Sequence, residues 1–305
     1  MQRNYLLPIV LFTACIGSDK DSTTDPAEIE ETEEPTDVPV LYLVSMMHAE
    51  ESVNHHQNEN IYGSYATALE LQRELFSSHG AKIDFGPDWT FIEGVRRWDS
   101  SQLSDHIASG HGIHTHAHES QYDLGEVNRL LADVGVTGNP IANGGFLTDG
   151  PDGTNWVGYI DSYNVDPDDP IFTTIIGYKN PQTQIPDTSG ACFRPSHTGD
   201  WSVEDTSGSL LYLGSNSEGE IGAGALDFAI LRDWIDSRLD TLDSDRMNTL
   251  YWHDSLHKYG NEADATTRRE QWEIEFEEYF DPLVADGRIQ WATFEEMAEI
   301  CAEWE

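Results

Sequence analysis

Two patterns of apolar and polar positions alternate along most of the chain. Short apolar runs rich in β-forming residues predict buried strands at residues 38–45, 81–85, 247–252 and 289–292. Between them, apolar residues recur at helical spacing. The predicted helices cover residues 65–77, 101–109, 122–134, 226–242, 267–286 and 294–304. Residues 139–150, rich in Gly and Asn, predict a loop, and the mostly polar residues 151–170 predict an insertion.

Strands that alternate with helices are typical of an α/β fold with a parallel sheet or barrel. In such folds ligands bind at the carboxyl ends of the strands. His48 and Glu50 follow the first predicted strand, and His253 and Asp254 follow a late one. We therefore expect these side chains at one edge of the sheet.

The charge balance excludes one class of partner. The chain has 56 acidic and 16 basic residues, which gives a formal charge of −40. Nucleic-acid binding depends on Lys and Arg at phosphates, so we expect no nucleic-acid partner. The hydrophobic fraction of 38%, with 9 Trp, is sufficient for a substantial core.

The first residues resemble a bacterial lipoprotein signal. Arg3 precedes an apolar run at residues 5–12, and small residues come just before Cys15. This predicts a signal peptide at 1–15, a lipidated Cys15, and an exported protein that is anchored to the bacterial cell envelope. Ordinary secretion is the alternative. Residues 16–37, dominated by Asp, Glu, Thr, Ser and Pro, predict an acidic disordered linker before a domain at 38–305.

Two cysteines remain if Cys15 is lipidated. In an exported protein, the pair Cys192 and Cys301 favours a disulfide. Two buried free thiols are the alternative.

Histidines concentrate in residues 110–118, which hold His114, His116 and His118 besides His111. Neutral imidazole is a common metal ligand. Histidines four apart meet one ion on a helix, and histidines two apart do so on an extended chain. Glu50, His114 and His118 predict a catalytic site for zinc or a similar ion with one open position.

These residues resemble the motifs of the polysaccharide deacetylases of the NodB-homology type, carbohydrate esterase family 4. The pair His114 and His118 fits the family's His-Ser/Thr-x-x-His motif. The resemblance implies a distorted (β/α) barrel, one divalent metal ion, with zinc as the first choice, and an acetylated glycan substrate. It implies that His114 and His118 bind the metal and that His116 does not.

The resemblance also implies roles for the residues after the first strand. Glu50 takes the place of the family's metal-binding carboxylate, and His48 stands where the catalytic base should be. This departs from the family pattern, because that base is an Asp. The alternative makes His48 a metal ligand and Glu50 or Glu51 the base.

Two later motifs complete the resemblance. Arg194 corresponds to the arginine that orients the base, and His253 to the general acid, with His257 in reserve. The implied enzyme is a metal-dependent carbohydrate deacetylase, a hydrolase of C–N bonds other than peptide bonds.

Two other functions stay open. A deacetylase-like domain without the usual base can be a glycan-binding or metal-binding lipoprotein. The pair His114 and His116 is also typical of amidohydrolases. Four other histidines are predicted to be solvated or at the surface: His55, His56, His79 and His106.

Overall fold

The computed structural model describes residues 39–49, 54–117, 121–144, 160, 162–164, 171–176, 192–195, 204–214, 227–260 and 262–304. These residues belong to one compact unit, Val38–Glu305. The predicted signal peptide and linker lie outside the described residues and stay predictions.

The first sheet is built around β1 (Leu41–His48). It pairs in parallel with β9 (Asn248–Ser255) along its whole length, from Leu41 opposite Asn248 to His48 opposite Ser255. Its second half pairs with β2 (Ile83–Gly86), and its first three residues pair with β10 (Ile289–Trp291). β3 (Gly112–Ile113) extends the sheet beyond β2. The carboxyl ends of β1, β2, β3 and β9 therefore meet at one edge.

The second sheet has the order β4-β5-β6-β8-β7. Its strands are β4 (Thr115–Ala117), β5 (Ile141–Gly144), β6 (Thr174–Ile176), β8 (Leu211–Leu213) and β7 (Cys192–Phe193). Only the β7–β8 pairing among these is antiparallel. His114 is the single residue between β3 and β4, so the chain passes from one sheet to the other at this histidine.

The helices lie between the strands, as the alternating pattern predicts. Polar caps fix several of their first turns: the Asp88 carboxylate accepts from the Phe91 N–H, and Asp123 forms a capping box with Glu126. The helices are α1 (Glu59–Ser78), α2 (Trp89–Trp98), α3 (Gln102–Ala108), α4 (Leu124–Asp133), α7 (Phe228–Leu239), α8 (Glu262–Glu275), α9 (Asp281–Ala285) and α10 (Phe294–Trp304), with short turns η1 (His55–Gln57) and η2 (Leu256–Lys258) and the π-helical η3 (Phe276–Phe280).

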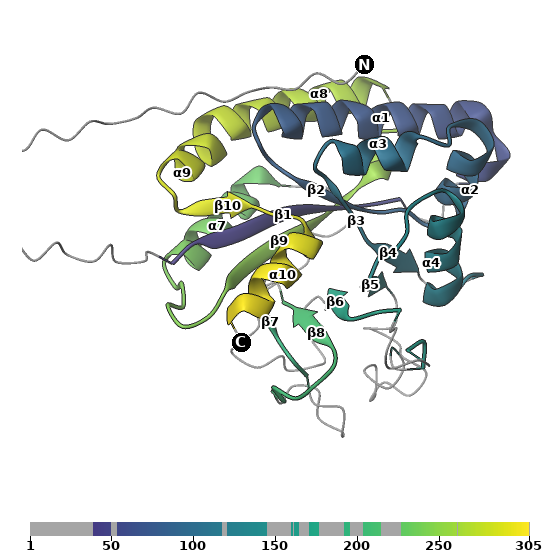
Figure 1. Cartoon of the computed structure of the whole chain (residues 1–305). Helices are drawn as coiled ribbons and strands as arrows, with labels where there is room; N and C mark the ends of the chain where they lie inside the picture. The colour runs from purple at the N-terminus through teal and green to yellow at the C-terminus, as the bar shows by residue number, and fades with distance from the viewer. Residues whose placement is uncertain are drawn as a thin grey trace, which may run out of the picture. The chain divides into compact units, whose positions relative to one another are not determined.

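The strands bury both faces. On β1, Leu41, Leu43 and Met47 join the larger core, which also holds apolar residues of α1, α3 and α8. Val44 and Met46 point the other way, into a second core that includes buried residues of β5, β6, β8 and α10. In Figure 1, α1, α3 and α8 lie along one face of the first sheet and α10 lies on the other. The even-numbered residues of β1 thus face the interior between the two sheets.

Most predicted helices and all four predicted strands agree with the structure, with four differences. β4, β6, β7 and β8 were not predicted, because strands of two or three residues are too short to show a pattern. The loop predicted at 139–150 contains β5, because a four-residue buried strand carries too few residues to outweigh its Asn and Gly. The helix predicted at 267–286 starts earlier and is divided into α8, η3 and α9. α2 was not predicted. Most of 151–170 lies outside the described residues.

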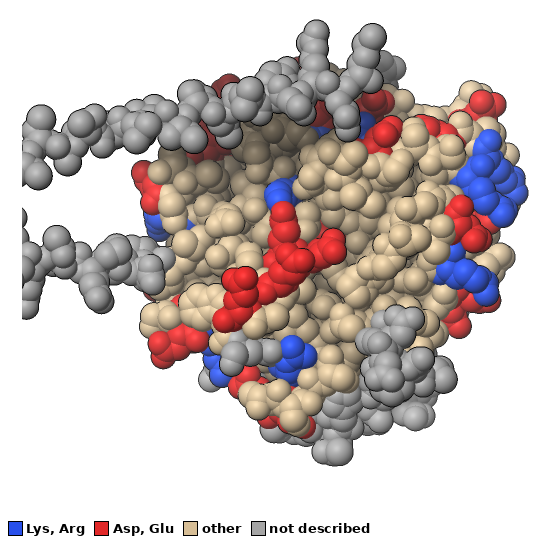
Figure 2. All heavy atoms as spheres, viewed as in Figure 1, with Lys and Arg blue, Asp and Glu red and all other residues tan. Residues whose placement is uncertain are grey.

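Figure 2 shows Asp and Glu side chains gathered in the middle of one face, which agrees with the net charge of −40. Within the described ranges, no helix combines the length and apolar character that crossing a bilayer requires.

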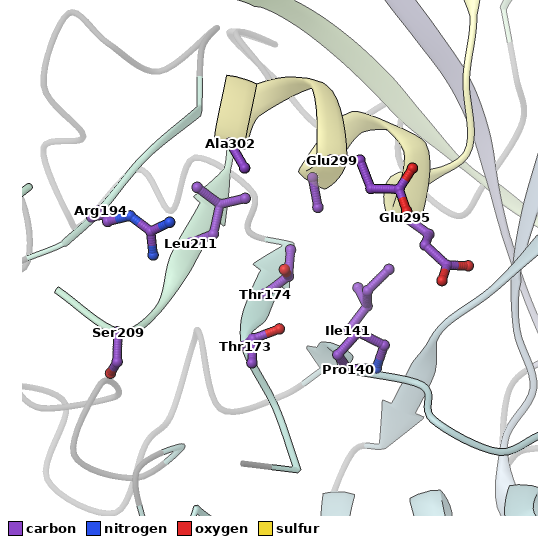
Figure 3. Close-up of a pocket in the computed structure, with 11 residues that line it drawn as sticks. Pro140, Ile141, Thr173, Thr174, Arg194, Ser209, Leu211, Glu295, Glu299 and Ala302 are labelled. Carbon is purple, nitrogen blue, oxygen red and sulfur yellow. The ribbon is translucent and has the colours of Figure 1, made fainter. Parts of the chain in front are cut away.

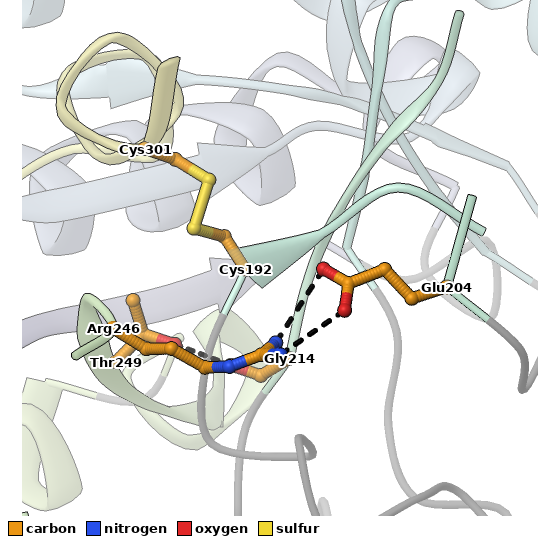
Figure 4. Close-up of a disulfide and its surroundings, with 6 residues drawn as sticks. All are labelled: Cys192, Glu204, Gly214, Arg246, Thr249 and Cys301. Atoms are coloured by element: carbon orange, nitrogen blue, oxygen red, sulfur yellow. Dashed lines mark hydrogen bonds and ion pairs between the residues drawn. A yellow bond between two sulfur atoms is a disulfide. The ribbon is translucent and has the colours of Figure 1, made fainter. Parts of the chain in front are cut away.

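The predicted disulfide is confirmed. Cys192 of β7 is bonded to Cys301 of α10 across a sequence separation of 109 residues (Figure 4). Phe294, Met297 and Cys301 are the buried residues of α10. The disulfide therefore ties the packed side of the last helix to the edge of the second sheet.

Replacing both cysteines, as Cys192→Ser/Cys301→Ser, should lower the free energy of unfolding by about 2–5 kcal/mol, because the closed loop restricts the unfolded chain. Denaturant titration of the variant and of the wild-type chain measures this difference. Wild-type protein treated with a thiol reductant is the matched control and should behave like the variant. A loss below about 0.5 kcal/mol, the range of neutral surface substitutions, contradicts the expectation.

Candidate metal centre

Three buried histidines come together at the edge where the first sheet passes into the second. His48, His114 and His116 each offer one ring nitrogen, and these atoms lie within 4.8 Å of one another. The exposed fraction of each side chain is at most 1%. Three imidazole nitrogens in such proximity suit zinc, copper, nickel or iron.

Strand alternation explains why these histidines meet. His48 ends β1 on the same face as Val44 and Met46, which point to the interior. His116 is the inward residue of β4, because its neighbour Ala117 packs in the outer core. His114 lies two residues earlier on the same extended segment, where residues two apart share a face.

His114 is held by a buried carboxylate. Its Nδ1 lies 2.8 Å from Asp84 Oδ1, and Asp84 Oδ2 accepts from the Phe294 N–H at 2.9 Å. An ionised carboxylate only accepts, so Nδ1 of His114 carries the proton. The Nε2 atom of His114 then presents its lone pair to the interior, as in carboxylate–histidine–metal arrangements.

His116 has a comparable partner. Its Nδ1 lies 3.1 Å from Asn143 Oδ1, and the Asn143 amide donates to the Ile176 carbonyl at 3.2 Å. This second bond orients the amide so that its oxygen faces the ring, and His116 therefore donates through Nδ1. Its Nε2 is left to act as a ligand.

His48 completes the group. Its Nε2 lies 2.9 Å from Nε2 of His114, and its ring stacks on His116 with centroids 3.7 Å apart. The close approach of His48 and His114 requires a glycine at position 86. A Cβ on Gly86 would lie 2.4 Å from Nε2 of His114 and 2.7 Å from Cδ2 of His48. The donor set of three neutral imidazoles fits a divalent transition-metal ion.

His253 lies beside this group. Its ring centroid is 4.5 Å from that of His48. It follows Tyr251, an inward residue of the second core, by two positions on β9, so it also faces the interior. His253 is thus adjacent to the three histidines of the cluster.

Asp254, by contrast, belongs to the opposite face of β9. It accepts hydrogen bonds from Tyr259 and, at 3.4 Å, from Arg268. Burial raises the pKa of its carboxyl group, while Arg268 opposes that shift. Asp254 therefore anchors η2 and α8 to the strand and does not orient His253.

Arg194 lies at the other edge of the second sheet. It donates to the Gly208 carbonyl at 3.1 Å and lines a cavity of about 310 Å³ (Figure 3). The same cavity is lined by α10 and by residues at the amino ends of β5, β6 and β8: Pro140, Ile141, Thr173, Thr174, Ser209 and Leu211. The structure thus does not bring Arg194 to the histidines, because antiparallel β7 carries it away from their edge.

Several predicted site residues lie outside the described residues: Glu50, Glu51 and His118. Their assignment as ligand or base stays a prediction. The structure brings together His48, His114 and His253 among the predicted residues, and it adds His116, to which the resemblance gave no metal role. The extended backbone is the reason, since it pairs residues two apart.

Sequence reasoning also missed Asp84 and Asn143. Both interrupt short strands that are otherwise apolar or small, and both are fully buried. A polar residue inside a buried strand needs a partner. That interruption was the available signal, but it does not identify the partner.

Comparisons with known proteins show the fold. Neither the family models nor the curated proteins include a match. A protein from Mycobacterium smegmatis assigned as a polysaccharide deacetylase has 10% identity and a TM-score of 0.51, with 88% of this chain and 92% of that one covered.

Two further structures agree. A Parabacteroides distasonis protein assigned as a glycoside hydrolase/deacetylase has 12% identity and a TM-score of 0.52, over 89% of this chain and 73% of that one. The 4-alpha-glucanotransferase of Thermococcus litoralis has 11% identity and a TM-score of 0.54, over 86% of this chain but only 40% of its own length. The predicted α/β fold of the NodB-type deacetylases is therefore confirmed.

The close packing at Gly86 leads to a prediction. Gly86→Ala should weaken Zn²⁺ binding about 10–100-fold, because the added methyl group displaces His114 and His48 from their ligand positions. Isothermal titration with Zn²⁺ measures the affinity. Gly63→Ala is the matched control, since a Cβ there meets nothing within 4 Å. Equal affinity in wild type and Gly86→Ala contradicts the assignment of this cluster as a metal centre.

Proposed function

We propose that this protein is a metal-dependent hydrolase that removes acetyl groups from an envelope or extracellular polysaccharide. The observation that carries the proposal is the inward-facing histidine cluster at the carboxyl ends of the strands in a NodB-type fold. Ligands of parallel α/β folds bind at that edge. The deacetylase assignments of two structural neighbours supply the reaction class.

Each residue of the cluster has a defined task in this proposal. His48, His114 and His116 hold the ion through their ring nitrogens, with Asp84 and Asn143 fixing two of the rings. When bound, a divalent ion, most simply zinc, would supply polarisation of the acetyl carbonyl and activation of a water molecule. His253 donates a proton to the departing sugar nitrogen or oxygen.

The proposed base is a carboxylate and not His48. Nε2 of His48 lies against Nε2 of His114, in a ligand position, so its lone pair is committed to the ion. Glu50 and Glu51 directly follow β1 in the sequence. We assign the role of base to Glu50 or Glu51. This is the alternative from the sequence in which His48 is a metal ligand.

Acetate release tests the function. We expect the full-length, Zn²⁺-loaded protein to release acetate from an acetylated glycan such as acetylxylan or a chitin oligosaccharide, and to lose this activity with a chelator. His114→Ala should reduce release more than about 100-fold, because it removes a ligand. His79→Ala is the control, since His79 is bonded to Asp281 outside the cluster.

Two outcomes count against the enzyme. Glycan binding without acetate release in metal-loaded protein supports the alternative of a catalytically degenerate binding lipoprotein, in agreement with the histidine at the usual base position. Unchanged release in His114→Ala rejects the assignment of the cluster as the catalytic centre.

We also propose that the protein is exported and held at the bacterial envelope by a lipid on Cys15. The proposal rests on Arg3, the apolar run at residues 5–12 and the small residues before Cys15. When the full chain is expressed in a bacterium, we expect it to partition into detergent and to incorporate labelled fatty acid. Cys15→Ser should abolish both, and label retained by this variant contradicts the anchor.

A further inference from the structure

His55 is a buried histidine without a hydrogen-bond partner. The prediction that it is solvated is wrong: its exposed fraction is 0%, and neither ring nitrogen has a partner. Buried polar atoms are nearly always paired, and an unpaired one reduces stability. A site that keeps such a group therefore needs an explanation.

The surroundings of His55 are aromatic. Its ring meets Tyr65 and Phe91 edge-on, with centroids 4.7 and 5.3 Å away. The ring of His257, on η2, lies 6.1 Å away and is only partly buried. A phenylalanine would suit the packing of His55 equally well, so packing alone does not account for a histidine.

The two histidines come from segments that leave neighbouring strands. η2 begins at Leu256, directly after β9, and η1 follows β1 by seven residues. β1 and β9 end in register, with His48 opposite Ser255. His55 and His257 therefore lie on the carboxyl side of the first sheet, on two connections that otherwise diverge into α1 and α8.

The ring of His55 is suited to bind a metal at neutral pH. Burial, followed by the neighbouring His257 and His56, lowers the pKa of His55 to about 3. Its imidazole is therefore neutral, with one nitrogen lone pair available as a ligand. Imidazole pairs suit zinc, copper and nickel.

The pair of His106 and His111 provides a contrast within the same protein. Their rings lie 5.0 Å apart, and His106 is also buried, against the surface prediction. However, Nδ1 of His111 accepts from the Ile83 N–H, and its Nε2 contacts Ser77 Oγ at 2.9 Å. Both nitrogens of His111 thus have partners, whereas neither nitrogen of His55 has one.

We propose that His55 and His257 form a second metal site, separate from the His48, His114 and His116 cluster, that takes a transition-metal ion preferring imidazole. The two side chains supply two ligands, and water completes the coordination. The ion joins η1 to η2 and so fixes the two connections that border the main centre. This inference does not depend on the deacetylase activity.

Zinc stoichiometry tests the proposal. The full-length protein, freed of metal, is dialysed against Zn²⁺ in buffer with high salt, which screens the acidic surface, and zinc is measured by elemental mass spectrometry. We expect two equivalents in the wild type, one in His55→Phe and one in His257→Ala. His106→Phe is the matched control for loss of a buried histidine and should retain two.

His114→Ala separates this proposal from the proposed function. It should lose the equivalent at the main cluster and retain the one at His55. If the wild type binds one equivalent, and His114→Ala but not His55→Phe loses it, the second site is rejected and the main centre stands. Two equivalents retained in both His55→Phe and His257→Ala also overturn the proposal.

Thermal unfolding is a second readout. Without metal, His55→Phe should melt at the same temperature as the wild type or higher, since it removes an unpaired buried group. Zn²⁺ should raise the melting temperature of the wild type by more than that of His55→Phe. An equal rise in both proteins contradicts a site at His55.

Discussion

The buried carboxylate of Asp84 joins the histidine cluster to the scaffold. It receives the imidazole N–H of His114 on one oxygen and the Phe294 N–H, at the start of α10, on the other. Burying a charge is costly unless hydrogen bonds replace water, and the amino end of a helix favours an anion. The carboxylate also requires the absence of a side chain at Gly112, where a Cβ would lie 2.0 Å from Asp84 Oδ2. The position of one ligand thus depends on β2, β3 and α10 together.

The carboxyl edge and the amino edge of the sheets carry different groups of residues. Histidines collect at the carboxyl edge, where β1, β4 and β9 end. The opposite edge carries the cavity lined by Arg194, Glu295 and Glu299. Burial, with Glu299 next, raises the pKa of Glu295. Arg194, which the resemblance assigns to the catalytic centre, lies at the edge opposite the histidines.

The described part of the site offers imidazole nitrogens, and the predicted ligand Glu50 lies outside the described residues. If the three imidazoles hold a divalent ion, they would leave its full charge in the site, which would favour a more acidic bound water than a carboxylate ligand would. The surrounding chain carries 56 acidic and 16 basic residues, and the negative electrostatic potential of such a chain attracts cations. An acidic protein with a neutral, buried histidine cluster is therefore well suited to gather a metal ion from dilute solution.

The sequence by itself determined the fold class, most of the helices and four strands of the first sheet, and it singled out the histidine-rich segment at residues 110–118. These features follow from local periodicity and composition, as the match between the predicted helix at 294–304 and α10 shows. It also indicated the Cys192–Cys301 pair, because the number of cysteines limits the choices.

Only the tertiary structure decided which side chains meet. The inward alternation on β1 and β4 selects His48 and His116, and parallel pairing across 66 residues brings His48 to His114. The same structure buries His55 in a segment of polar composition and carries Arg194 to the far edge. Such outcomes depend on strand register and on contacts between distant segments, which a local pattern of residues does not encode.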